Sequence, residues 1–409
     1  MQNVGLSNNQ VTVSVITGGH FFSHFYLLTL PPIFPMLRAE FGLSNAQLGL
    51  LISVISLAMV LQLPVGEVVD RIGAKVVFTI GLVVTSAGIV LTGTSSSYLW
   101  LLTFTIVSGL GQSTFHPAGY PLIESASTPA RQGRNFSIHT FGGYVGSATA
   151  PLIVGAIAVI IHWQIALIAV GLLGLAYAIV VWFTIEPIYH GSATQSTEDT
   201  DSSPSVGSLD ALLRPGILVM FLFFFVITMA NKGVQSFTPL LAIDAFALTE
   251  GVGNVALSAF FATTALGVLA GGVLADRYDP RRVIAASLGI STLGIWFLVA
   301  GPLTITATLM VAITGAVGIF YGLIYPSRDK LVSMLSADGS TGRSFGFVFT
   351  GTSIGGFLSP VFLGVVIDIS TIIIAFQLVA LFFLLSGIVA LLVGSRFIGA
   401  KEWASVTAK

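Results

Sequence analysis

The sequence predicts an all-α membrane protein with twelve transmembrane helices, arranged as two pseudo-symmetric six-helix bundles. Three observations predict this fold class: the chain carries very little charge, its apolar runs have the length of membrane spans, and its two halves repeat each other. Only 8% of the 409 residues are charged, whereas an average soluble protein has about 25%. This is too little charge to cover the surface of soluble domains of this size.

The composition also excludes several classes of function. A net charge of −1 leaves no basic surface for nucleic acid. The absence of cysteine excludes thiolate nucleophiles and zinc–sulfur sites. The chain has no Gly-x-x-x-x-Gly-Lys loop for nucleotides and no catalytic Ser-His-Asp set within its apolar runs. We therefore expect a protein that is not an enzyme and needs no cofactor, with a mean hydropathy of +0.96 that places most of it in lipid.

The membrane spans follow from the apolar runs, because a spanning helix needs roughly 20 apolar residues. Polar or turn-forming breaks separate the runs. The twelve predicted spans are 12–37, 46–69, 76–94, 98–120, 135–160, 163–185, 215–243, 252–275, 283–301, 304–326, 344–368 and 371–395.

A polar segment divides these spans into two sets of six. Residues 187–213 contain serine, threonine and the acidic residues Glu198 and Asp199, a composition typical of a solvated linker. We therefore predict an N-terminal bundle over 1–186, a cytoplasmic linker over 187–213 and a C-terminal bundle over 214–409.

The distribution of positive charge predicts the orientation. Fourteen of the 16 lysines and arginines fall on one side of the predicted spans, among them Arg328, which follows the tenth span. Arg38 lies on the other side, and Lys232 lies inside a span. Because cytoplasmic loops are enriched in lysine and arginine, we predict a multi-pass protein of the cell membrane with both termini in the cytoplasm.

The two halves share a repeated pattern. Gly66 and Asp70-Arg71 recur 206 positions later as Gly272 and Asp276-Arg277. The fifth and eleventh spans match in a register of 209, which aligns Gly133, Arg134, Phe136, Gly142, Gly146, Pro151 and Gly155 with Gly342, Arg343, Phe345, Gly351, Gly355, Pro360 and Gly364. Parallel six-helix repeats joined by a polar loop are typical of secondary transporters, whose substrate binds between the repeats.

Two motifs give a family resemblance. The segment from Gly66 to Lys75, which reads Gly-x-x-x-Asp-Arg-x-Gly-x-Lys, resembles the signature loop of the major facilitator superfamily. The Gly- and Pro-rich stretch from Gly142 to Gly155 is similar to that superfamily's antiporter-type motif. The resemblance implies a major facilitator fold, with spans one, four, seven and ten around a central cavity.

The N-terminal half most resembles the fosmidomycin-resistance efflux branch. Ser23-His24, Phe115-His116-Pro117 and the stretch from Gly142 to Pro151 carry this resemblance. Two carboxylates that the branch usually has near its histidines are absent, with Leu27-Leu28 and Ala118 in their places.

The lone cation within a span indicates the charge of the substrate. A lysine near the middle of a membrane helix costs roughly 2.5–3.5 kcal/mol, and no carboxylate is predicted at the depth of Lys232. An organic anion would supply the counter-charge, whereas cationic drugs are not expected. Alternatively, Lys232 is neutral or bonded to backbone carbonyls, and the nearby tyrosines only pack. The predicted substrate-binding residues are His24, Gln112, Tyr144, Asn231, Lys232, Gln235, Tyr321 and Tyr325.

Four histidines in the N-terminal half predict proton coupling, because imidazole titrates near neutral pH. They are His20, His24, His116 and His139. Alternatively, His116 bonds a carbonyl that Pro117 frees, and His139 lies at the wet cytoplasmic rim. A metal site is not predicted, because no cysteine or carboxylate within the spans completes a ligand shell.

The repeated Asp-Arg pairs predict a cytoplasmic latch. The resemblance implies that such an aspartate meets the N-terminus of a helix of the opposite half, attracted by the helix dipole. The predicted gating residues are Asp70, Arg71, Glu124, Arg131, Arg134, Asp276, Arg277, Asp329 and Arg343.

The sequence thus predicts a monomeric secondary active transporter. It would move a small organic anion, of carboxylate or phosphonate type, by proton-coupled alternating access in the lipid bilayer. The main alternative is efflux of neutral or amphipathic compounds by proton antiport. A transport-inactive sensor and a lipid flippase also remain open.

Overall fold

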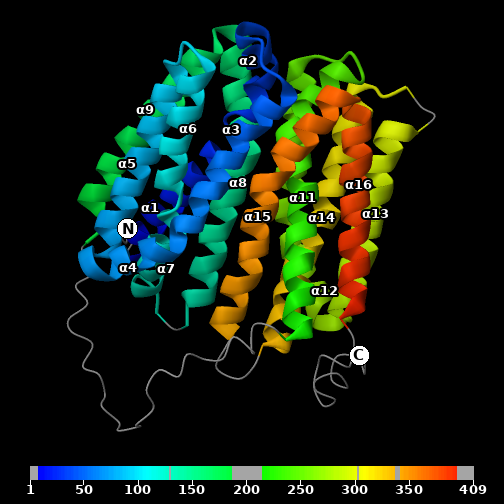
Figure 1. The fold of residues 1–409 in the computed structure, drawn as a ribbon. Helices are drawn as coiled ribbons and strands as arrows, with labels where there is room; N and C mark the ends of the chain where they lie inside the picture. Colours follow the sequence, from blue (N-terminus) through cyan, green and yellow to red (C-terminus); the bar gives the residue numbers. More distant parts are fainter. Residues whose placement is uncertain (1–7, 129, 187–213, 302–303, 337–340, 394–409) are drawn as a thin grey trace, which may run out of the picture.

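The computed structural model describes residues 8–128, 130–186, 214–301, 304–336 and 341–393. Within these residues the chain is helical and contains no strand. Ten of the described helices are long and apolar enough to cross a membrane, or 11 if the bent pair α3–α4 counts as one span. The predicted class, an all-α multi-pass membrane protein, is confirmed (Figure 1).

Several predicted spans of the first half are each made of more than one helix. The helices are α1 (Asn8–Tyr26), η1 (Pro31–Ile33), α2 (Phe34–Phe41), α3 (Asn45–Ala58), η2 (Met59–Leu61), α4 (Gln62–Ile72), α5 (Ala74–Gly93), α6 (Tyr98–Gln112), α7 (Phe115–Ser125), α8 (Gln132–Ile160) and α9 (Trp163–Thr184). The breaks within the predicted spans 12–37, 46–69 and 98–120 come shortly before Pro31, Pro64 and Pro117. Proline lacks the N–H group that the preceding turn needs and clashes with that turn's carbonyl.

The helices of the second half are longer. They are α11 (Pro215–Asp244), α12 (Glu250–Arg277), α13 (Pro280–Ala300), α14 (Ala307–Leu335), α15 (Thr341–Ile369) and α16 (Ile372–Leu392). Helix α14 continues past the predicted end at residue 326. Arg328 therefore lies inside α14, beyond the predicted end of the span, and its assignment to the cytoplasmic side stays a prediction.

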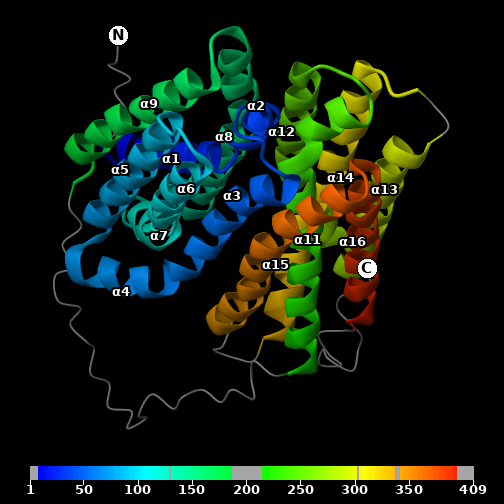
Figure 2. The same ribbon diagram turned by 45° about the horizontal axis from the view of Figure 1, so that its top comes forward.

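The helix boundaries follow the predicted repeat. Helices α8 and α15 both have 29 residues. Gln132 and Thr341 are 209 positions apart, and so are Ile160 and Ile369, which is the register of the sequence repeat. Figures 1 and 2 show α1–α9 on one side of the molecule and α11–α16 on the other, with α3 beside α15. The predicted linker 187–213 lies outside the described residues, so the division into domains stays a prediction.

Glycines let helices of the two halves cross closely. A Cβ atom on Gly155 of α8 would lie 2.2 Å from the side-chain nitrogen of Asn254 in α12, and one on Gly364 of α15 would lie 2.4 Å from the carbonyl oxygen of Asn45 in α3. Asn45 and Asn254 are also 209 positions apart. The two crossings therefore repeat each other, and only glycine permits so close an approach.

The outward faces of the helices expose large apolar side chains. Leu99 in α6 and Phe183 in α9 are 69% and 81% exposed. Such side chains would be a liability in water, but they suit helices that face lipid.

Candidate functional site

The four histidines that the sequence grouped come together in one cluster. His20 of α1 stacks on His139 of α8, with ring centroids 4.0 Å apart. Its ring also lies 4.5 Å from that of His24 on α1 and 5.7 Å from that of His116 on α7. Three helices therefore supply this cluster, which we call the histidine cluster. The proton-coupling role assigned to it stays a prediction.

Several ring nitrogens of the histidine cluster have no hydrogen-bond partner. His20 Nδ1 lies 2.8 Å from the backbone oxygen of His139, and His24 Nδ1 lies 3.3 Å from the hydroxyl of Ser147. In contrast, His20 Nε2, His116 Nδ1 and His139 Nδ1 are buried without a partner among the described residues. His139 is 1% exposed, so it does not lie at a wet rim. No bond from His116 to a backbone carbonyl is found within the described ranges.

The arrangement also changes the expectation about metals. One nitrogen from each of His20, His24 and His116 can be chosen so that all three lie within 4.8 Å of one another. The sequence argument required a cysteine or carboxylate, but three imidazoles alone form the protein ligand set of some zinc sites. The expectation that these residues hold no metal was therefore based on too narrow a ligand set.

Lys232 lies on α11 without a counter-charge. No salt bridge or hydrogen bond joins its ammonium group to another residue in the described part of the chain. Its Cε atom would lie 3.7 Å from a Cβ placed on Gly356 of α15. The neighbouring Asn231 has a buried side-chain oxygen that finds no partner among the residues that the structure describes. The alternative in which backbone carbonyls hold Lys232 is not seen.

Two predicted substrate-binding amides differ in their surroundings. The Gln112 side chain accepts a hydrogen bond from the Ser23 hydroxyl at 2.8 Å and donates one to the Ser23 backbone oxygen at 2.7 Å. Gln112 therefore ties α6 to α1 through both of its polar atoms. Gln235 lies one turn after Lys232 on α11 and is 5% exposed.

The predicted tyrosines meet between the halves, next to a cation that the sequence analysis missed. The ring of Tyr144 on α8 lies 6.2 Å from that of Tyr325 on α14, and the Tyr325 hydroxyl donates to Tyr321 at 3.1 Å. The Arg328 guanidinium lies 4.0 Å over the Tyr325 ring and 3.0 Å from Asp329.

Lys232 is therefore not the lone cation inside the bundle, because the Arg328 side chain is only 14% exposed. A signal for this existed in the sequence. Tyr321, Tyr325 and Arg328 have the i, i+4, i+7 spacing of one helix face.

The predicted cytoplasmic latch is not formed in this conformation. Arg71 pairs with Glu67 of its own helix, Glu124 accepts a 3.4 Å bond from Gln132, and Asp329 pairs with Arg328. The remaining gating residues are exposed and form no ion pair within the described ranges: Asp70, Arg131, Arg134, Asp276, Arg277 and Arg343.

The two halves are instead tied at their opposite end. Arg38, in the last turn of α2, donates two hydrogen bonds of 2.6 and 2.7 Å to Asp244, which ends α11. Asp368 of α15 accepts from the backbone N–H groups of Asn45 and Ala46 at 2.8 and 2.9 Å and from the Asn45 side chain at 2.8 Å. A carboxylate of one half thus caps the first turn of α3 in the other, where the helix dipole favours negative charge.

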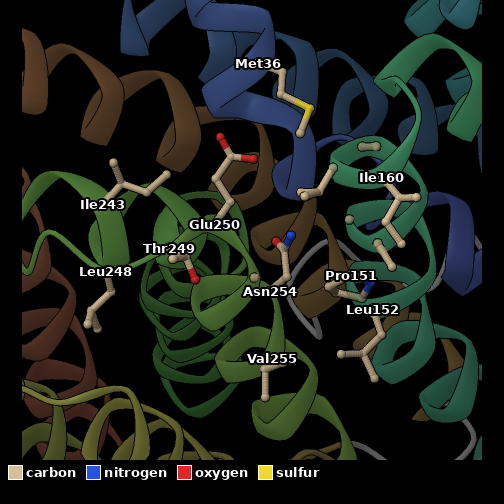
Figure 3. Close-up of a pocket in the computed structure, with 15 residues that line it drawn as sticks. Met36, Pro151, Leu152, Ile160, Ile243, Leu248, Thr249, Glu250, Asn254 and Val255 are labelled. Atoms are coloured by element: carbon tan, nitrogen blue, oxygen red, sulfur yellow. The ribbon is translucent and has the colours of Figure 1, made fainter.

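A separate pocket opens between α8 and α12. It has a volume of about 780 Å³ and includes none of the predicted substrate-binding residues. In Figure 3, Pro151 and Ile160 of α8 lie across from Asn254 of α12. Apart from Thr249, Glu250 and Asn254, its lining consists of apolar residues and glycine.

Comparisons with known proteins agree with this architecture. The family model described as Major Facilitator Superfamily matches residues 16–253 and 230–401. The fosmidomycin resistance protein of Escherichia coli (strain K12) is 27% identical over 379 residues, which cover 90% of this chain and 89% of the relative. A probable sulfoacetate transporter of Cupriavidus necator is 25% identical over 376 residues, 85% of each chain.

A solved structure has the same fold. The crystal structure of a bacterial homologue of the human lysosomal transporter Spinster, in an inward-facing and occupied conformation, superposes with a TM-score of 0.77. The overlap covers 94% of this chain and 96% of that one at 15% identity, so it bears on the fold alone.

Proposed function

Because this chain belongs to the major facilitator superfamily, and is thus a multi-pass membrane transporter and not an enzyme, we propose that it carries a small organic anion across the membrane. The substrate would be of carboxylate or phosphonate type, and transport would proceed by alternating access between the two halves. The likeness to a probable sulfoacetate transporter supports an anionic solute, since sulfoacetate is an organic anion.

The observation that carries this proposal is the Lys232 ammonium group without a partner. A cation inside a membrane span is stable only when an opposite charge or polar groups compensate it. The described residues provide no carboxylate for Lys232, and the buried Asn231 oxygen next to it is also unpaired. A bound anion would compensate the charge of Lys232.

Arg328, a cation of the second half, also favours a negatively charged substrate. Its guanidinium is buried among aromatic rings, but Asp329 already neutralises part of its charge. We therefore assign the main attraction to Lys232. Tyr144 and Tyr325 would offer hydroxyl groups to the same solute, because they meet where the halves face each other.

The conformation fits one stage of alternating access. With the predicted orientation, the end tied by Arg38–Asp244 and by Asp368 is the outer one, and the end with exposed Asp70 and Asp276 is the cytoplasmic one. The structure would then represent the state open to the cytoplasm, and the predicted latch would form only after the halves rock to the outward-open state.

A second candidate is efflux of neutral or amphipathic compounds. The pocket between α8 and α12 favours it, because its lining is largely apolar and it lies between the halves (Figure 3). The likeness to the fosmidomycin resistance protein is in line with an efflux function.

Flux into proteoliposomes separates these candidates. The purified protein would be tested against carboxylates, phosphonates, amphipathic compounds and cationic drugs, with and without an imposed pH gradient. We expect uptake of anions. Lys232→Met should lower it by about 10–100-fold, the equivalent of about 1.5–3 kcal/mol for a bond to a charged group, whereas Lys232→Arg should retain part of it.

Arg214→Met serves as the matched control, because it removes an exposed cation from the start of the same helix. Its flux should equal that of the wild type. Transport of cations but not of anions, or full anion flux in Lys232→Met, would overturn the proposal.

A further inference from the structure

We propose that His20, His24 and His116 bind a divalent transition-metal ion of the zinc class. This site goes beyond the proposed function, because anion transport through Lys232 requires no metal. The geometry, the hydrogen bonding and the chemistry of the donors each support it.

The geometry places three possible metal-binding nitrogens close together. The three nitrogens lie within 4.8 Å of one another and come from α1 and α7. Bonds of about 2.0–2.1 Å to a tetrahedral ion would place them about 3.4 Å apart. Binding the ion would therefore require the rings to rotate and bring their nitrogens closer together.

The hydrogen bonds leave the donor atoms free. A backbone oxygen only accepts, so His20 Nδ1 must carry the proton in its 2.8 Å bond to His139. In the neutral ring Nε2 then holds a lone pair, and this atom is buried without a partner in the described part of the chain. An unsatisfied buried acceptor is costly, and a metal ion would remove that cost.

The same bonds also form the outer shell that metal-binding histidines usually have. One ring nitrogen of a ligating histidine binds the metal, and the other donates to a carbonyl, carboxylate or hydroxyl that fixes the ring. The His139 carbonyl does this for His20, and the Ser147 hydroxyl lies 3.3 Å from Nδ1 of His24. His116 offers a buried Nδ1 that has no hydrogen-bond partner within the described ranges.

The donor set selects the class of ion. Imidazole suits zinc, copper and nickel, whereas magnesium and calcium need oxygen ligands. The chain has no cysteine that would favour a thiolate metal. Three protein nitrogens leave a tetrahedral ion one further position. A water molecule can fill it or, if the proposed function holds, a carboxylate of the carried anion.

Metal binding can be measured on the full chain in detergent without any organic anion, so its outcome is independent of transport. The affinity tag must lack histidines, because a polyhistidine tag would bind the same ions. We expect an equimolar amount of Co²⁺ with the absorption spectrum of a tetrahedral site, displaced by Zn²⁺. His24→Gln and His116→Gln should abolish this binding.

Two further variants test the site more sharply. Ser147→Ala should weaken zinc binding by about 10–100-fold, the usual loss when an outer-shell partner of a ligand is removed. His162→Gln is the matched control, because His162 is exposed and precedes α9, outside the histidine cluster. It should bind zinc as the wild type does.

Equal binding in the wild type and in the His24→Gln and His116→Gln variants would overturn the proposal, and so would a wild type that binds no zinc. If a variant fails to fold, X-ray absorption on the zinc-loaded wild type decides instead. A shell of three imidazole nitrogens at about 2.0–2.1 Å is expected, and a shell of oxygens alone would refute it.

Discussion

Asn45 and Asn254 occupy equivalent positions in the two repeats, but only Asn45 uses its side-chain nitrogen. Asn45 donates to Asp368 at 2.8 Å, whereas both side-chain polar atoms of Asn254 are buried without a partner in the described part of the chain. Asp368 belongs to the second half, and the equivalent position of the first half is occupied by Val159. The repeat thus preserves the close packing of α8 on α12 and of α15 on α3, but it does not preserve the polar contacts made there.

The Asp279 carboxylate, in the turn between α12 and α13, is bonded to both the backbone and the side chain of Arg281. It caps α13 by accepting from the Arg281 backbone at 3.0 Å and pairs with the Arg281 guanidinium at 2.7 Å. Burial opposes its ionisation, but the bonds from Arg281 and the charges of Arg281 and Arg282 outweigh burial and hold the pKa of Asp279 below its ordinary value.

This lowered pKa gives a pH dependence at the residue scale. A carboxyl group with a lowered pKa in the folded state stabilises the fold above its unfolded pKa of about 4 and loses this contribution as the pH falls through the folded value. Asp279→Asn keeps a good capping residue but removes the charge. Thermal unfolding in detergent should show a lower Tm for the variant at pH 7 and a difference that shrinks on acidification.

The control for this prediction is Asp276→Asn, which changes a neighbouring exposed aspartate that forms no ion pair with any described residue. Its Tm should follow that of the wild type at each pH. A pH-independent difference for Asp279→Asn would contradict the electrostatic explanation.

At the scale of single elements, the sequence predicted the register of the helices better than their continuity. The 209-residue repeat gave the matching bounds of α8 and α15, because glycine and proline positions mark where helices cross. The spans 12–37, 46–69 and 98–120 were each predicted as one run although each contains a break, since apolar composition alone does not distinguish a straight helix from a broken one. Pro239 and Pro360, in contrast, lie inside continuous helices.

The crossing of α15 over α3 gives a prediction for a single element. Gly364→Ala would bring a Cβ atom to 2.4 Å from the Asn45 backbone oxygen, which cannot turn away as a side chain would. Overpacking of this kind costs about 1–3 kcal/mol. The variant should unfold at a lower temperature.

Gly342→Ala near the start of the same helix is the matched control, because no described residue comes within 4 Å of a Cβ atom there. It should be neutral or stabilising, since alanine favours helix by about 1 kcal/mol over glycine. Similar losses of Tm in both variants would show that the close crossing is not the cause.

At the scale of the whole molecule, the contacts that join the halves could not be predicted from local pattern. Arg38 and Asp244 are 206 positions apart, and each is an ordinary charged residue at a helix end. The histidines, in contrast, stood out because histidine is rare in apolar spans. The sequence therefore indicated which residues gather inside one bundle, but not which residues hold the two bundles together.

The contacts at the tied end should set the balance between conformations. Arg38→Gln and Asp244→Asn each remove the bidentate ion pair and should shift that balance away from the present state. The expected shift is about five-fold, for a pair worth about 1 kcal/mol. Spin labels on introduced cysteines can measure the opening, and the natural chain has no cysteine to remove.

The double variant should open this end no further than either single one, because both changes break the same pair. Arg71→Gln provides the comparison, since Arg71 pairs within its own helix, and it should leave this end closed. If Arg71→Gln opened this end equally, the distances between the spin labels would reflect a general loss of packing and not the loss of the Arg38–Asp244 pair.

The Arg38–Asp244 pair is about one-quarter to one-third exposed, with side-chain accessibilities of 31% and 25%. Dissolved salt screens charges that water reaches, and the screening length shortens from about 10 Å at 0.1 M to 3 Å at 1 M. The ionic strength of the medium at this face would therefore weaken the pair without any ligand. The transporter would open more readily towards a saline compartment than towards a dilute one.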